Sequence, residues 1–260
     1  MIPLYDAHNH LQDERLADRV EQIVSELPSL GLKACVVNGT SEKDWATVAA
    51  LAKRFDWIIP AFGLHPWFLK TRSQRWFDTL RRFVDETPLA TIGEIGLDRW
   101  IKDPDIADQE KVFVAQLELA AERNIAVSIH CLKAWGHLED VLKTHSLPAR
   151  GFLLHSYGGS LEVARSLSKL GASFSISGYF AHDRKDAQRE IFKIIPLERL
   201  LVETDAPDML PPPQLITHPA GEANDPRNLP KIYEFAARLF NQPDDTFAAR
   251  VETNFKSLFC

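Results

Sequence analysis

The sequence predicts an α/β fold of the (β/α)8 type, a TIM barrel, and three observations predict it. Eight short apolar runs recur along the 260 residues. Stretches with helical periodicity separate these runs, and ionisable residues stand where several of the runs end. Alternation of strand and helix is typical of a parallel sheet covered by helices. Eight such units close a barrel, which we expect to form a single domain over residues 1–260.

The predicted strands are short, rich in β-branched or bulky apolar residues, and lack clear polar alternation. Strands that are buried on both faces have this composition. An open doubly wound sheet is the alternative, but no GxGxxG motif follows the first strand. The eight predicted strands are residues 4–6, 33–39, 57–63, 89–94, 126–130, 151–156, 173–177 and 200–205.

Helical patterns connect the strands. Residues 45–52 carry apolar side chains at i, i+3, i+4 and i+7, and residues 163–170 form a similar apolar face that ends at Gly171. A longer helix is predicted over residues 105–123. The proline-rich segment 207–230 reads as a long irregular loop, a kind of segment that is often functional or mobile.

Composition excludes several classes of protein. The formal net charge of −6 does not favour binding of long duplex nucleic acid, and no apolar run is long enough to cross a bilayer. Cys35, Cys131 and Cys260 are too widely spaced for a disulfide framework or a CxxC zinc site, which suits a reducing cytoplasm. We therefore expect a cytoplasmic protein without a membrane segment. The sequence does not fix its oligomeric state, and a monomer is compatible with it.

Histidines and carboxylates mark the ends of the predicted strands. His8 and His10 follow the first strand at alternate positions, so their side chains point to the same side of an extended chain. The fourth, fifth, sixth and eighth strands end in Glu94, His130, His155 and Asp205. In a parallel barrel these ends share one rim, where barrel enzymes carry their chemistry. A single histidine at a strand end is usually structural, but the joint placement predicts a metal site.

Four histidines and two carboxylates suit zinc, manganese, iron or nickel better than calcium. Six ligands are more than one tetrahedral ion needs, and they match two ions about 3.5–4 Å apart that share a carboxylate. Such ions lower the pKa of a bound water towards about 7, so hydrolysis becomes feasible at neutral pH. The ligands predict hydrolysis without naming the bond, which leaves phosphodiesters, amides and lactones open.

Seven segments resemble, in order, the motif series of the TatD-type metal-dependent hydrolases, which are (β/α)8 barrels of the amidohydrolase superfamily. The segments are YDAHNHL, AFGLHP, IGEIGLD, SIHCLKA, LLHSYGGS, ETDAP and RNLP. The resemblance extends over essentially the whole chain and implies two divalent ions, zinc, manganese or magnesium. His8, His10 and Asp205 would bind one ion and His130 and His155 the other, with Glu94 as the bridge.

The resemblance also implies catalytic roles. Asp205 would orient or deprotonate the attacking water beside the bridging Glu94, and His65 of GLHP would lie near a substrate phosphate as a donor. Leu132 and Lys133 depart from the family, which often has arginine followed by an acidic residue there. The expected substrate contacts follow strands and are cationic or aromatic: His65, Arg99, Trp100, Lys133 and Tyr157.

The sequence is therefore compatible with three functions. The first, which we favour, is a deoxyribonuclease or related phosphodiesterase that acts on single-stranded DNA or oligonucleotide ends. The second is a hydrolase of small amides, esters or lactones, which an uncrowded neutral pocket without cationic residues would favour. The third is a metal-binding protein without catalytic activity, against which the intact ligand set argues.

Overall fold

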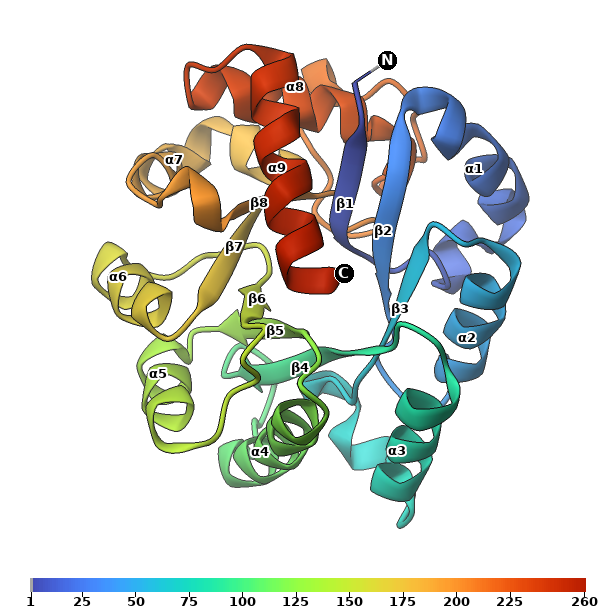
Figure 1. Ribbon diagram of the computed structural model, residues 1–260, viewed down its shortest axis with the longest axis vertical. Helices are drawn as coiled ribbons and strands as arrows, with labels where there is room; N and C mark the ends of the chain where they lie inside the picture. Colours follow the sequence, from blue (N-terminus) through green and yellow to red (C-terminus); the bar gives the residue numbers. More distant parts are fainter. Residues whose placement is uncertain (1) are drawn as a thin grey trace.

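The computed structural model describes residues 2–260 and contains an eight-stranded parallel barrel surrounded by helices (Figure 1). The strands follow one another around the sheet in chain order, which confirms the predicted (β/α)8 fold. Their bounds are β1 (Leu4–Asn9), β2 (Leu32–Asn38), β3 (Ile58–Phe62), β4 (Thr91–Asp98), β5 (Val127–Leu132), β6 (Phe152–Leu154), β7 (Ala172–Ser177) and β8 (Leu200–Glu203).

Each strand is followed by one or more helices. The α-helices are α1 (Val20–Glu26), α2 (Trp45–Arg54), α3 (Trp76–Glu86), α4 (Ile106–Arg123), α5 (Trp135–Thr144), α6 (Leu161–Lys169), α7 (Asp186–Phe192), α8 (Leu229–Leu239) and α9 (Asp244–Phe259). A short 3₁₀ helix, η3 (Pro66–Thr71), follows β3. Within residues 2–260 no helix combines the length and the apolar character needed to span a membrane.

Backbone and side-chain hydrogen bonds join the first strand to the last. The Asp205 amide donates to the carbonyl oxygen of His8 (2.9 Å). The buried Asp6 carboxylate accepts from the Thr204 amide (2.9 Å) and from the Thr204 hydroxyl (2.6 Å). A buried carboxylate is tolerated only when such partners satisfy it. These bonds bring the polar residues that follow β1 next to those that follow β8.

Strand β4 is longer than the sequence suggests. It was predicted to end at Glu94, but it pairs with β5 as far as Asp98, which lies opposite Leu132. That predicted boundary is wrong, and Glu94 lies in the middle of the strand. Gly96 allows the extension, because its φ is +153° and a Cβ there would lie only 1.9 Å from the carbonyl oxygen of His130.

The predicted helices and the predicted loop are found with small shifts. Helix α4 matches the expected helix and ends at Asn124 in the left-handed conformation. Gly171, after α6, has a φ of +96°. The predicted loop 207–230 is irregular except for two short 3₁₀ turns and the start of α8. Asn224 ties this loop to the barrel by donating from its side chain to the carbonyl oxygen of Thr204 (2.8 Å).

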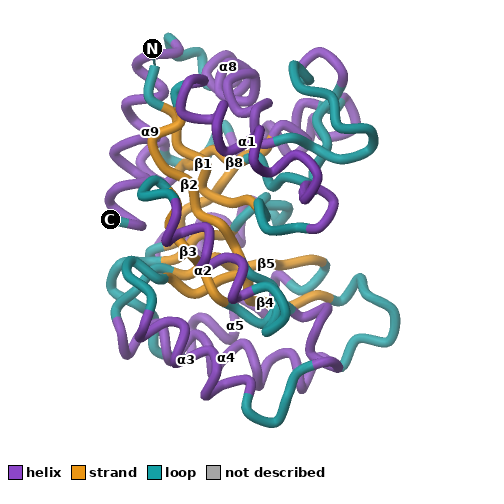
Figure 2. Tube along the Cα trace, turned by 90° about the vertical axis from the view of Figure 1, so that its right-hand side faces the viewer, coloured by secondary structure: helices purple, strands orange, loops and turns teal. Residues whose placement is uncertain are grey.

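The last helix covers the barrel end where the strands begin. Helix α9 crosses the front of the barrel in Figure 1 and forms its left side in Figure 2. Phe255 packs on Tyr5 (ring centroids 4.9 Å apart), and the Asn254 side chain donates to the carbonyl oxygen of Leu200 (2.8 Å). The opposite end, formed by the segments that follow the strands, is the carboxyl rim, and it carries the polar residues described next.

Candidate metal centre

The six predicted ligands converge at the carboxyl rim, with Glu94 at their centre. One side of Glu94 faces ligands from the first and last strands. Its Oε2 atom lies 3.5 Å from His8 Nε2 and 3.3 Å from His10 Nε2. Asp205 Oδ1 lies 3.6 Å from each of these nitrogens. Four potential ligand atoms therefore surround one space.

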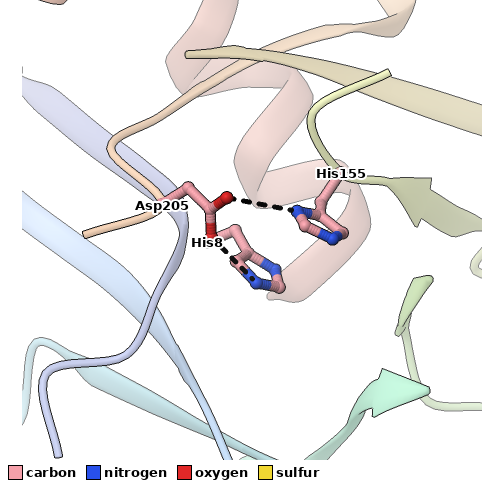
Figure 3. A group of neighbouring side chains, drawn as sticks. All are labelled: His8, His155 and Asp205. Carbon is pink, nitrogen blue, oxygen red and sulfur yellow. Dashed lines mark ion pairs between the residues drawn. The ribbon is translucent and has the colours of Figure 1, made fainter. Parts of the chain in front are cut away.

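The other oxygen of Glu94 faces a second set of ligands. Its Oε1 atom lies 2.9 Å from His155 Nε2 and 3.1 Å from His130 Nδ1, and these two nitrogens are 3.3 Å apart. Figure 3 shows Asp205 reaching both His8 and His155, whose rings stack with centroids 4.0 Å apart. Glu94 thus offers one oxygen to each of two adjacent ligand groups.

The hydrogen bonds of two histidines fix which nitrogen faces the site. His10 Nδ1 lies 2.8 Å from the carbonyl oxygen of Asn38, which can only accept, so Nδ1 carries the proton. His130 Nε2 is likewise bonded to the Asp98 carboxylate (3.1 Å). His10 Nε2 and His130 Nδ1 therefore present lone pairs to the oxygens of Glu94. Two acceptors that face each other need a positive charge between them, which a proton on the nitrogen or a metal ion can supply, so this set of atoms fits a metal ion.

The electrostatics of the cluster lead to the same conclusion. Burial alone would lower the pKa of both His10 and His155, but Glu94 and Asp205 raise these values to about 9 and about 10. Burial alone would raise the pKa of Glu94, yet the surrounding histidines hold it well below its usual range. The cluster is thus built to hold positive charge next to Glu94, either as protons or as metal ions.

His65 lies in the cluster but is not arranged as a ligand. Its Nδ1 accepts a hydrogen bond from the Trp67 amide (3.2 Å), so its proton is on Nε2. Nε2 lies 3.3 Å from Glu94 Oε1. Burial lowers the pKa of His65 to about 4, so the ring is neutral at pH 7. His65 therefore presents a neutral N–H donor to the centre.

The other expected substrate contacts divide into two groups. Arg99, Trp100 and Lys133 are exposed next to the centre, with Lys133 Nζ 5.9 Å from the Trp100 ring. Tyr157 is fully buried, and its hydroxyl donates to the carbonyl oxygen of Ser160 (2.6 Å). The prediction that Tyr157 contacts substrate is therefore wrong, because its ring packs inside the protein.

Sequence reasoning missed two buried carboxylates that support the ligands. The Asp98 carboxylate accepts hydrogen bonds from three groups: His130 Nε2 (3.1 Å), Trp67 Nε1 (2.6 Å) and the Trp100 amide (2.6 Å). Glu94 and Asp98 are an even number of residues apart in one strand, so their side chains point to the same face of the sheet. This spacing was the signal in the sequence that could have identified Asp98.

Glu203 is the second missed carboxylate. It accepts from the amide (2.7 Å) and the hydroxyl (2.5 Å) of Ser156 and from the Ser175 hydroxyl. It thereby fixes the segment that carries His155, whose Nδ1 lies 3.9 Å from Glu203 Oε1. Its position two residues before Asp205 was the corresponding signal in the sequence.

The fold and the site together define a class of protein, a (β/α)8 barrel with the ligand set of a metal-dependent hydrolase at its carboxyl rim. The sequence model of the family described as TatD related DNase matches residues 5–260, and the chain belongs to that family. The family expected from the motifs is thus confirmed.

Several relatives match over nearly the whole chain. The uncharacterized metal-dependent hydrolase YjjV of Escherichia coli (strain K12) is 29% identical over 98% of this chain and 96% of its own length. The 3′-5′ ssDNA/RNA exonuclease TatD of Pantoea sp. (strain At-9b) is 30% identical over 98% of this chain and 99% of its own. The crystal structure of YjjV from E. coli K12, a TatD homolog, superposes with a TM-score of 0.91 over 98% of this chain and 97% of that one, at 29% identity.

Proposed function

We propose that this metal-dependent hydrolase is a phosphodiesterase that shortens single-stranded DNA or RNA, or oligonucleotides, from an end. The observation that carries the proposal is the position of Glu94, with one oxygen towards each of two ligand groups. Two-metal centres of this kind suit displacement at phosphorus. The name of the Pantoea relative, 3′-5′ ssDNA/RNA exonuclease, supports the choice of substrate.

We assign the ligands to two divalent ions, zinc, manganese or magnesium. His8, His10 and Asp205 would hold the first ion, His130 and His155 the second, and Glu94 both. When bound, such ions supply a water of lowered pKa and a positive charge that stabilises developing negative charge on substrate oxygens. Cys35, Cys131 and Cys260 are free thiols, which supports our placement of the protein in the cytoplasm.

The chain's own residues would move the proton and orient the substrate. Asp205 turns Oδ1 towards His8 and His10, at 3.6 Å, and its Oδ2 lies 4.0 Å from His155 Nδ1. Oδ2 is therefore the less closely paired oxygen, and it would accept a proton from the attacking water. Burial raises the pKa of Asp205 above its ordinary value, so its ionised carboxylate is a stronger base than that of a free aspartate. The neutral His65 would donate from Nε2 to a phosphate oxygen beside Glu94, without carrying charge into the site.

The test is hydrolysis of end-labelled single-stranded DNA and RNA of the same sequence. Metal-stripped protein is supplied separately with Mg²⁺, Mn²⁺ and Zn²⁺ and compared with the Asp205→Asn variant. Asp208→Asn is the matched control, because Asp208 lies in the same loop but is half-exposed and bonded to Arg15 (2.8 Å). We expect metal-dependent shortening that Asp205→Asn abolishes and Asp208→Asn retains.

The product ladder would give the polarity of cleavage. If DNA and RNA both stay intact while bound metal is confirmed, the nuclease proposal fails. The same centre would then have to act on small amides, esters or lactones.

A further inference from the structure

Exposed aromatic side chains gather next to the metal centre. Large apolar side chains are exposed at five positions in the described part of the chain. Three of these lie in the segments after β3 and β4: Trp67 and Phe68 in η3, and Trp100 two residues after β4. The Trp67 side chain is 53% exposed and that of Trp100 is 65% exposed. Single exposed apolar residues are common, but a cluster beside a catalytic centre indicates a surface that binds a ligand.

The two tryptophans are held by the same carboxylate. The Trp67 indole donates to Asp98 Oδ2 (2.6 Å), and the Trp100 amide donates to Asp98 Oδ1 (2.6 Å). Asp98 is completely buried and also accepts from His130. The Trp67 ring is therefore fixed although half of it is exposed, and it is anchored to the group that orients a proposed metal ligand.

The ring of Trp67 lies against two histidine rings of the centre. Its ring lies edge-on to that of His65 with centroids 5.1 Å apart, and 6.2 Å from the His130 ring. A planar group stacked on Trp67 would thus lie close to His65, the proposed phosphate donor, and to His130, a proposed metal ligand.

Two cationic side chains flank the tryptophans. Lys133 Nζ lies 5.9 Å from the Trp100 ring, and Arg99 contacts His137 Nδ1 (3.3 Å) rather than a carboxylate. Both are exposed, in a chain whose formal net charge is −6. Cationic side chains that no carboxylate neutralises directly are suited to contact a phosphate backbone. Aromatic rings interleaved with cationic side chains are the usual surface for unpaired nucleic acid.

We propose that Trp67 and Trp100 form an aromatic subsite that stacks bases of single-stranded nucleic acid next to the bond to be cut, with Arg99 and Lys133 on the backbone. This inference rests on the proposed function, and it specifies how the proposed nuclease would recognise its substrate. Bases in a duplex already stack on their neighbours, so this subsite selects unpaired ends. It does not depend on base identity, because every base offers a flat face.

The test compares two oligonucleotides of equal length, one complete and one that lacks the bases of its end nucleotides at both termini. Binding to metal-free protein is measured by fluorescence anisotropy and hydrolysis by the metal-loaded enzyme. We expect the wild type to prefer the complete strand, and Trp100→Ala to reduce this preference about 5- to 150-fold. Trp67→Phe keeps a stacking ring and should retain more of the preference than Trp67→Ala.

Leu89→Ala is the matched control. Leu89 is 65% exposed, like Trp100, but precedes β4 at the other end of the barrel, so its replacement should leave the preference unchanged. Equal affinity of the wild type for both strands, or a preference that survives in Trp100→Ala, overturns the subsite. Base-dependent binding without any hydrolysis would support the subsite while defeating the nuclease proposal, so the two failures are distinguishable.

Discussion

Replacement of Asp98 by asparagine should weaken one of the two metal sites. Three N–H groups converge on this carboxylate, two on Oδ2 and one on Oδ1. Asparagine has one oxygen and one NH₂ group, so at least one donor would face another donor. If the asparagine NH₂ group turns towards His130, the imidazole loses the acceptor that holds its proton on Nε2. The Nδ1 lone pair is then no longer kept on the side of the proposed metal ion.

The size of the effect follows from the role of this bond. Although burial alone would raise the pKa of Asp98, His130 and Trp67 hold it at about 2, so the acceptor is a full carboxylate at neutral pH. Loss of such a partner typically reduces metal affinity 10- to 100-fold. This corresponds to about 1.4–2.8 kcal/mol of binding free energy. The ion held by His8, His10 and Asp205 should be much less affected.

The assay is calorimetric titration of metal-stripped protein with Mn²⁺ or Zn²⁺. Asp103→Asn is the control, because Asp103 is exposed and its φ of +52° is a conformation that asparagine also tolerates. We expect two binding events in the wild type and in the control, and a weakened second event in Asp98→Asn. Wild-type affinity at both sites in a folded Asp98→Asn protein would refute the assignment of Asp98 as the residue that orients His130.

Three further outcomes are expected. Glu94→Gln should retain fewer ions than the wild type and lose hydrolysis, because an amide offers only one oxygen to two ligand groups; metal analysis with full occupancy would contradict this. Gly96→Ala should destabilise the fold by about 1–3 kcal/mol or more in denaturant unfolding, since its Cβ meets a backbone oxygen at 1.9 Å, whereas Gly136→Ala, with nothing within 4 Å, should not. The melting temperature of the metal-free protein should fall as the pH rises from about 6.5 to about 10. The folded protein raises the pKa values of His10 and His155 to about 9 and about 10, so both bind their protons more tightly than they do in the unfolded chain. The stability gained in this way is complete below the pKa of an unfolded histidine and is lost as the pH rises through the two folded-state values. A melting temperature that rises across this window would contradict the cluster electrostatics.

The sequence alone located most of the centre, because each ligand stands at or near the end of an apolar run. In a parallel barrel the ends of such runs must meet at one rim. His8 and His155 are far apart in the chain, yet their rings stack, because the ends of β1 and β6 meet at this rim. The error at Glu94 arose because a charged residue inside an apolar run was read as the end of a strand, whereas the barrel interior at this rim is polar.

The features that were missed or wrong depend on packing across the barrel. Tyr157 follows Ser156, whose φ of +41° turns the chain, and its ring contacts Trp135 and Phe174 inside the protein. No local pattern encodes that turn. The roles of Asp98 and Glu203 likewise depend on donors supplied by other segments, such as Trp67 for Asp98 and Ser175 for Glu203. A polar residue in a strand shows only that partners are required, not which ones.

Anomalous diffraction from crystals of this protein loaded with Mn²⁺ would test the central claim most directly. We expect two peaks, one on either side of Glu94, about 3.5–4 Å apart. One should contact His8, His10 and Asp205, and the other His130 and His155. A single peak at saturating metal, or peaks away from Glu94, would contradict the two-metal assignment on which the proposed hydrolysis depends.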